Sequence, residues 1–227
     1  PTPPEDAAKG LVWTEILRLV DRQGARGGFV SASDVDRQRF AKHPWSLGGG
    51  GAAELKELLE LRSSESPRSL GATIGRTTVV GEDDAWIMSS RDVERRADPS
   101  LARPLVLGDC VRDWKIDGAP TVIYPYSALG GPPVESIRGP LLRHLWRYRT
   151  SLAGRTVFGK SLAIQGRPWW EHLEHYREKL RTPFSISFAF VATHNHFVLD
   201  CGGKLFNRSA PVIKLLPTAT EDEHRGL

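Results

Sequence analysis

The sequence predicts an α+β protein in which an N-terminal helical segment precedes a mixed or antiparallel sheet domain with packed helices. Three observations lead to this fold class. Apolar residues recur at helical spacing near the N-terminus, and residues 184–190 alternate apolar and small side chains as a half-buried strand does. Strand and helix patterns also occur in blocks rather than in βαβ alternation. We therefore expect a helical connecting segment at residues 1–63 and a second domain at residues 64–227.

Each expected element follows from its local pattern. Apolar residues recur at helical spacing from Val12 to Val20, and the glycine-rich residues 24–28 end that helix. A second N-terminal helix follows a run of four glycines, and the same spacing predicts helices at residues 141–152 and 168–180. Short β-rich runs predict strands at residues 73–80, with a break at Gly75, and at residues 105–107, 121–124, 184–190, 196–200 and 212–216.

The composition is typical of a globular protein from a reducing compartment. The chain has 227 residues, and no apolar run approaches the roughly 20 residues that a membrane span needs. Two cysteines, Cys110 and Cys201, are too few for a disulfide framework. The chain starts at Pro1 without a signal peptide. We therefore expect a segment of a longer cytoplasmic protein that makes no membrane contact.

Charge is unevenly distributed along the chain, although the net charge is only +4. Residues 136–170 contain no Asp or Glu, whereas acids gather within residues 82–98 and 221–223. A stretch of one sign predicts a positive surface that attracts a polyanion, unless folding brings acids to its arginines. If the polyanion is DNA, phosphate contacts are expected from Arg143, Arg147, Arg155, Lys160 and Arg167.

A polar turn near the C-terminus has side chains of the kind that read DNA bases. Residues 204–211 follow a strand pattern and a Gly-Gly turn, and they present Lys, Asn and Arg between apolar residues. Asn can bind the adenine edge and Arg the guanine edge, although a structural hairpin with a solvated tip would show the same pattern. Base or groove contacts are expected from Arg76, Asn195, Lys204, Asn207 and Arg208.

Two short motifs favour a different class, a metal-dependent nuclease. Asp113-Trp114-Lys115 matches the Asp-x-Lys half of a nuclease site, in which the carboxylate holds Mg²⁺. His194 and His196 would share one face of a strand. The upstream Pro-Asp that accompanies the first motif is absent, and the histidines have no apparent third ligand. We therefore expect no metal site and keep the nuclease as an alternative.

Residues 182–214 closely resemble the C-terminal region of the PglX family, the adenine-specific DNA methyltransferases of BREX and phage-growth-limitation defence systems. More broadly, the layout resembles the specificity domains of TaqI-like methyltransferases. The resemblance implies that residues 64–227 recognise double-stranded DNA and contact the catalytic domain of the same protein. Further stretches that resemble the family are residues 43–47, 74–76 with 82–84, 108–109 with 112–114, and 122–126.

The catalytic motifs of such enzymes are missing from this segment. These enzymes hold a flipped adenine with the motif Asn/Asp-Pro-Pro-Tyr/Phe. The Pro-Pro pairs of this chain, residues 3–4 and 132–133, lack the Asn or Asp before the pair and the Tyr or Phe after it. A Phe-x-Gly-x-Gly loop for S-adenosylmethionine is also absent. We therefore expect no catalytic residue and no cofactor here, with S-adenosylmethionine belonging to the parent enzyme. A docking module for other defence proteins or for a phage inhibitor is the second alternative.

Overall fold

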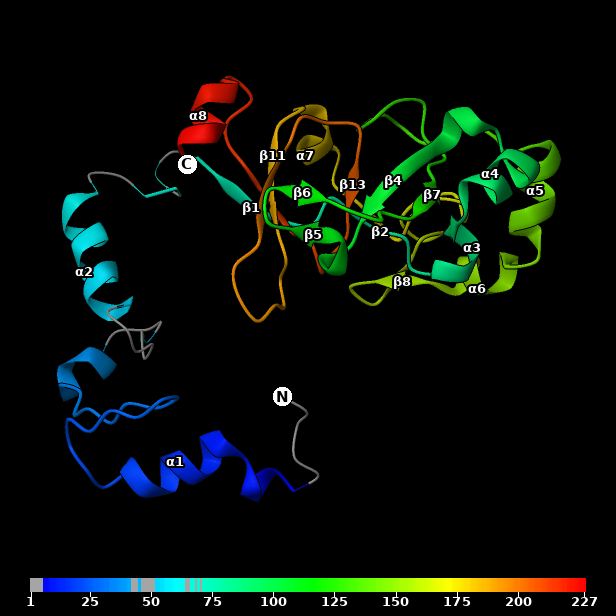
Figure 1. The fold of residues 1–227 in the computed structure, drawn as a ribbon. Helices are drawn as coiled ribbons and strands as arrows, with labels where there is room; N and C mark the ends of the chain where they lie inside the picture. The colour runs from blue at the N-terminus through cyan, green and yellow to red at the C-terminus, as the bar shows by residue number, and fades with distance from the viewer. Residues whose placement is uncertain (1–5, 42–44, 46–51, 64–65, 68, 70) are drawn as a thin grey trace. The chain divides into compact units, whose positions relative to one another are not determined.

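The computed structural model of the chain (Figure 1) describes every residue outside a few short stretches, which are residues 1–5, 42–44, 46–51, 64–65, 68 and 70. The four-glycine run falls in one of these stretches, so it lies outside the described residues. Contacts within the chain divide it into two compact units, Pro1–Glu65 and Ser66–Leu227. No helix of the described part is long and apolar enough to cross a membrane.

The first unit is a set of short helices joined by loops. Glu15 holds one of these loops, because its carboxylate accepts hydrogen bonds from the backbone amides of Gly28, Phe29 and Val30 at 2.9, 2.6 and 3.0 Å. These bonds, chiefly the one from Phe29, lower the pKa of the Glu15 carboxyl because they stabilise its charged form. The described helices are η1 (Ala7–Lys9), α1 (Leu11–Leu19), η2 (Arg37–Phe40) and α2 (Ala52–Arg62).

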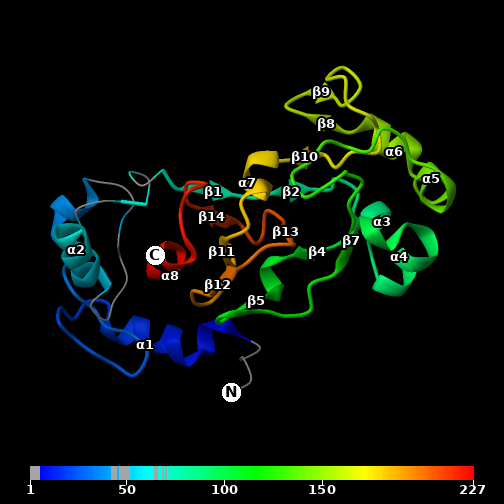
Figure 2. The ribbon, with the colours of Figure 1, turned by 90° about the horizontal axis from the view of Figure 1, so that it is seen from above.

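The second unit is built on two four-stranded sheets (Figure 2). The first is antiparallel and has the order β1 (Thr73–Gly75), β14 (Val212–Lys214), β11 (Ser185–Phe188), β12 (Phe197–Asp200). The second is mixed, parallel only at its first pair, and has the order β13 (Leu205–Phe206), β4 (Ala102–Val106), β7 (Thr121–Ile123), β3 (Ile87–Met88).

Three two-stranded pairs and several short helices complete this unit. The pairs are β2 (Thr78–Val79) with β10 (Glu174–His175), β5 (Val111–Arg112) with β6 (Lys115–Ile116), and β8 (Thr156–Val157) with β9 (Lys160–Ser161). The helices are α3 (Asp83–Trp86), α4 (Ser90–Arg96), η3 (Pro99–Leu101), η4 (Gly108–Cys110), α5 (Gly139–Trp146), α6 (Arg149–Gly154), α7 (Arg177–Arg181) and α8 (Glu221–Gly226).

Two apolar clusters hold the second unit together. The larger cluster surrounds Trp86 and Tyr124, which are fully buried, and Leu145 of α5 packs into it. The smaller cluster joins the two sheets, because it contains Phe206 of the mixed sheet and Val198 of the antiparallel sheet. The loops at this junction are therefore carried by well-packed strands on both sides.

The predicted α+β class is confirmed, and several element predictions need correction. The helix expected at residues 168–180 is wrong, since β10 and the short α7 occupy its second half. The carbonyls of Trp169 and Glu171, which a helix would use internally, instead accept hydrogen bonds from Arg155. The helix expected at residues 141–152 is two helices, α5 and α6.

The β-rich run at residues 73–80, predicted with a break at Gly75, forms two strands. Gly75 ends β1 with a φ of 147°, a value that side-chain-bearing residues rarely adopt. The chain then changes sheets, so that β1 pairs with β14 whereas β2 pairs with β10. The pattern did not show that residues 76–77 belong to neither strand, or that the chain changes partner there.

Candidate nucleic-acid interface

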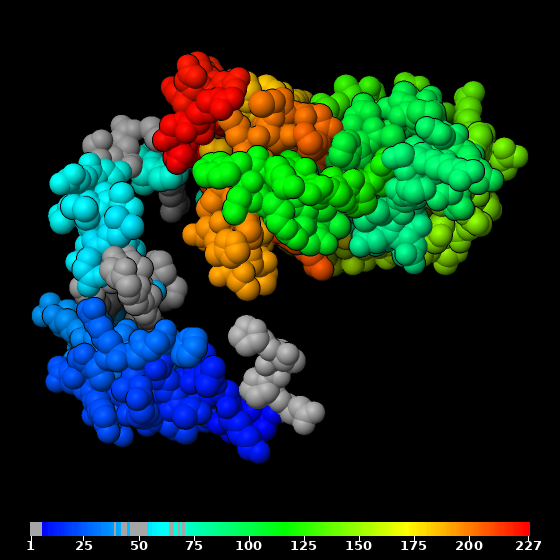
Figure 3. Space-filling model, viewed as in Figure 1, coloured from blue at the N-terminus to red at the C-terminus, as the bar shows by residue number. Residues whose placement is uncertain are grey.

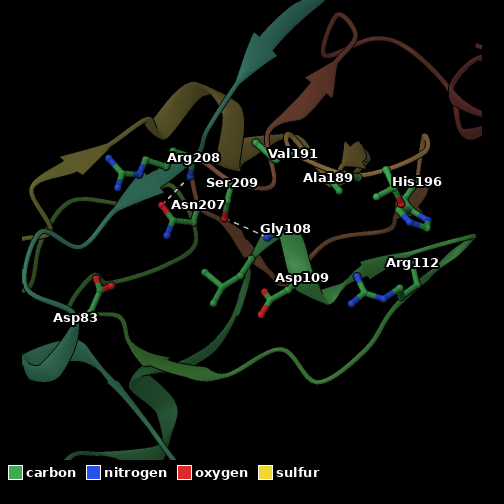
Figure 4. A pocket seen from close by; sticks show the side chains of 13 residues that line it. Asp83, Gly108, Asp109, Arg112, Ala189, Val191, His196, Asn207, Arg208 and Ser209 are labelled. Carbon is green, nitrogen blue, oxygen red and sulfur yellow. Dashed lines mark hydrogen bonds between the residues drawn. The ribbon is translucent and has the colours of Figure 1, made fainter. Parts of the chain in front are cut away.

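An open groove of about 660 Å³ lies in the second unit where loops of both sheets meet (Figure 4). Its walls are η4 with the residues after it, the loop that joins β11 to β12, and the turn that joins β13 to β14. The start of α3 adds a carboxylate. The charged or hydrogen-bonding side chains that line it include Asp83, Asp109, Arg112, His196, Asn207 and Arg208.

The turn between β13 and β14 is fixed by hydrogen bonds to both walls. The Asn207 amide donates to the carbonyl of Val106 at 3.0 Å, which ties the turn to β4. The Phe190 amide donates to the carbonyl of Ser209 at 3.0 Å, and the Gly108 amide donates to Ser209 Oγ at 3.0 Å. The turn therefore presents its side chains from a rigid backbone.

Two tightly packed residues, Thr77 and Gly108, hold this turn in place. Thr77 is fully buried and bonds both backbone groups of Phe206, because its Oγ1 accepts from the Phe206 amide at 2.8 Å and its amide donates to the Phe206 carbonyl at 3.0 Å. At Gly108, a Cβ atom would lie only 2.5 Å from the carbonyl oxygen of Ser209. A side chain at Gly108 would therefore push the turn away from η4.

The polar groups of the groove form a mixed set of donors and acceptors. Asn207 Oδ1 accepts from the Arg208 amide at 2.6 Å, so its side-chain NH₂ stays available to the groove (Figure 4). Asp83 and Asp109 add carboxylate acceptors, and Arg112 adds guanidinium donors. Such a set matches the donors and acceptors on base edges better than it matches an apolar ligand.

Two of the five residues predicted to contact bases, Asn207 and Arg208, line this groove. Asn195 is exposed in the β11–β12 loop, between Thr193 and His196, which do line it. The structure therefore brings these three predicted residues to one region of the surface.

The other two predicted base contacts, Arg76 and Lys204, do not line the groove. Arg76 pairs with Glu174 at 2.6 Å between Nη2 and Oε2, and this carboxylate raises the pKa of Arg76. Lys204 pairs with the buried carboxylate of Asp200. Both cations are held by ion pairs within the fold, so a base contact would first have to break those pairs.

Arg155 corrects the set of predicted phosphate contacts. Its side chain is buried, and its guanidinium donates to the backbone carbonyls of Leu152, Val80, Trp169 and Glu171. Burial lowers the pKa of Arg155 to about 10, because the charged group has lost hydration. Arg155 therefore holds loops together inside the protein and is not available to a phosphate.

The remaining predicted phosphate contacts fall into two groups. Arg167 is also engaged within the fold, because its Nε lies 3.0 Å from Glu171 Oε2 and its other nitrogens donate to two backbone carbonyls. Arg143, Arg147 and Lys160 are exposed. Of the five predicted phosphate contacts, these three remain candidates.

Several groove residues were not predicted from the sequence as site residues. Asp83, Asp109 and Arg112 come from segments far from the 207–209 turn and meet it only in the folded chain. A signal for them was present, since all three fall in short stretches that resemble the PglX family. Trp114, beside them in the sequence, is 85% exposed at a φ of 64°.

The two motifs that favoured a nuclease also come together. Asp113 Oδ1 lies 2.8 Å from His196 Nδ1, and potential ligand atoms of Asp113, His194 and His196 all lie within 4.8 Å of one another. The other motif therefore places a carboxylate beside the histidine pair, which the sequence alone did not show. The expectation of no metal site was based on the absence of such a ligand.

Comparison with known proteins places the whole chain beside part of an adenine-specific methyltransferase. That relative is the adenine-specific methyltransferase PglX of Streptomyces coelicolor, to which the chain is 40% identical over 233 aligned residues. The match covers all of this chain and 19% of the relative, so the chain spans about a fifth of the length of that protein. No protein-family model matches the chain. The resemblance to PglX predicted from the sequence is confirmed.

Proposed function

We propose that this chain is the DNA-reading part of an adenine-specific methyltransferase related to PglX. The observation that supports the proposal is the groove, in which Asn207 and Arg208 project from a turn fixed by hydrogen bonds to both sheets. Side chains that recognise bases need a rigid backbone, because hydrogen bonds to base edges depend on geometry. Asn207 suits adenine, Arg208 suits guanine, and a groove carboxylate can accept from cytosine.

Phosphate contacts supply the sequence-independent part of this function. Arg143, Arg147 and Lys160 are exposed cations of the acid-free stretch, and each phosphate that they neutralise would release counterions. Such contacts fix the register of the protein on the duplex and leave sequence reading to the groove. We assign methyl transfer and the binding of S-adenosylmethionine to the catalytic domain of the same cytoplasmic protein. This segment and the catalytic domain would clamp the DNA together.

The proposal is tested by fluorescence anisotropy with duplex DNA at two salt concentrations. We expect log K to fall with log salt at a slope of about 0.9 per neutralised phosphate. Arg143→Ala should weaken binding to all sequences equally and reduce this slope by about 1. Arg225→Ala is the matched control, because Arg225 is an exposed arginine that pairs with Glu221 and does not line the groove.

Base reading is tested in the full-length enzyme through the sequence that it methylates. Asn207→Ala or Arg208→Ala should relax specificity at one position of the site, at a cost of about 1–3 kcal/mol. An unchanged methylated sequence in both variants would show that these residues do not read bases. Absence of DNA binding by the full-length enzyme in low salt would contradict the proposal as a whole.

A further inference from the structure

We propose that Asp113, His194 and His196 form a binding site for a divalent transition-metal ion of the Zn²⁺ class. Each residue offers one ligand atom, a carboxylate oxygen or an imidazole nitrogen, and these atoms all lie within 4.8 Å of one another. Imidazole and carboxylate groups are ligands with which proteins hold Zn²⁺. The site is independent of the proposed DNA reading, because metal binding needs only these three side chains.

The fold brings Asp113 to the histidines through the β5–β6 hairpin. β12 packs against both strands of this hairpin. At the hairpin tip the Trp114 amide donates to the carbonyl of Phe197 at 3.1 Å. His196 directly precedes Phe197, so Asp113 and His196 become neighbours, with 2.8 Å between Oδ1 and Nδ1. Their proximity therefore follows from strand packing and a backbone hydrogen bond.

The two histidines are arranged as a pair of ligands to one ion would be. They are separated by one residue, and their ring centroids lie 4.2 Å apart at an interplanar angle of 55°. His194 is exposed, whereas the His196 side chain is only 13% exposed and is held by Asp113. One imidazole is thus already positioned, and the other lies close to it at the surface.

Among the residues that the structure describes, no Lys or Arg forms an ion pair with the Asp113 carboxylate. Lys115 pairs with Asp117, with 3.0 Å between Nζ and Oδ2. Arg112 Nη1 donates to the carbonyl of Val111 at 2.8 Å. The Asp113 carboxylate is therefore left to His196 and to an ion. Zinc sites with three protein ligands usually keep a further position for water or another ligand, so the ion would also be open to solvent.

A bound ion would link two walls of the groove. Asp113 belongs to the β5–β6 hairpin, and His194 and His196 belong to the β11–β12 loop, whose residues line the groove. Since the loop and the hairpin are joined here by side chains and one backbone bond, an ion would add a cross-link between them. We therefore expect metal binding to raise the melting temperature of the chain.

The site is tested by titrating the chelator-treated 227-residue chain with Zn²⁺ by calorimetry and with Co²⁺ by visible absorption. We expect one ion per chain, Co²⁺ bands that Zn²⁺ abolishes, and no displacement by excess Mg²⁺, which prefers an all-oxygen octahedral site. Asp113→Asn and His194→Gln should each weaken Zn²⁺ binding at least about tenfold, since even outer-shell changes cost that much.

Asp222→Asn is the matched control, because Asp222 is an exposed carboxylate that does not belong to the cluster and does not pair with Lys115. Circular dichroism checks that each variant is folded, and both Asp113 and His194 are exposed, so their replacement leaves the core intact. The proposal is overturned if the unmodified chain binds less than one ion. It is equally overturned if Asp113→Asn and His194→Gln bind Zn²⁺ as tightly as Asp222→Asn does.

Discussion

At the scale of single residues, His172 connects three parts of the main core through its ring. Its Nε2 lies 2.8 Å from the carbonyl oxygen of Ile123, so this nitrogen carries the proton, and its Nδ1 lies 3.1 Å from Thr78 Oγ1. The ring packs edge-on against Trp86, at 5.0 Å between centroids. Burial lowers the pKa of His172 from 6.5 to about 3, because a charged ring would lose its hydration.

This buried histidine predicts a loss of stability in acid. Below pH 6.5 the unfolded chain takes up a proton at His172 while the folded chain does not, so the free energy of unfolding falls as the pH falls toward 3. For His172 alone, the loss between pH 7.5 and pH 5 should be about 2 kcal/mol. Urea denaturation at a series of pH values measures this slope.

Two substitutions separate the contribution of His172 from that of other groups. His172→Gln should lower the free energy of unfolding at pH 7.5 and make its pH dependence shallower, because the titrating group is gone. His194→Gln, measured with a chelator present, is the control for the substitution itself, because it makes the same replacement at an exposed histidine. An equally steep slope in His172→Gln would mean that other groups cause the acid sensitivity.

At the scale of elements, the β5–β6 hairpin has an aromatic residue where a turn usually has glycine or asparagine. Trp114 has a φ of 64° and is 85% exposed. A left-handed backbone costs a residue with a side chain roughly 1–2 kcal/mol, and no packing offsets this cost at an exposed tip. Such strain at an exposed aromatic, two residues after Arg112 of the groove wall, favours a role in contacting a ligand.

Trp114→Asn tests both parts of this reasoning, because Asn tolerates the left-handed conformation. We expect the free energy of unfolding to stay the same or to rise by up to about 1 kcal/mol. If the proposed DNA reading is correct, loss of base stacking should weaken DNA binding by about 1–3 kcal/mol. Full DNA affinity in this variant would exclude a stacking role, and lower stability would show that the tryptophan packs.

The elements also show how far sequence reasoning reaches. The strand predicted at residues 184–190 was found as β11, because alternation with a period of two is a local property. The helix predicted at residues 168–180 failed because Arg155 binds the carbonyls that the helix needed. No local pattern shows which arginine will be buried against free carbonyls. The same contacts exclude Arg155 from the predicted phosphate contacts.

The candidate site was predicted in part for the same reason. Asn207 and Arg208 could be found because a polar turn between apolar strands is visible in one stretch of sequence. Asp83 and Asp109 face the same groove from distant segments. The pairing of β13 with β4 brings Asp109 to the turn, and the hydrogen bonds between Thr77 and Phe206 bring the segment that contains Asp83. The meeting of Asp113 with His194 and His196 likewise depends on the packing of β12 against the hairpin.

At the scale of the whole molecule, the two units differ in how much apolar surface they bury. Among the described residues, every buried apolar side chain except Leu19 lies in Ser66–Leu227. That unit also contains both apolar clusters, the groove and the proposed metal site. Since burial of apolar surface is the main source of stability, this unit should fold without residues 1–65.

A chain that begins at Ser66 tests this independence. We expect it to unfold in one cooperative transition, with a melting temperature within about 2 °C of that of the full chain. A loss of about 1 kcal/mol in the free energy of unfolding would shift the melting temperature by about 2–4 °C. It should also bind Zn²⁺ with the same affinity. Calorimetry of both chains measures the first property and titration the second. A markedly lower melting temperature, or aggregation of the shorter chain, would show that residues 1–65 cover apolar surface of the second unit.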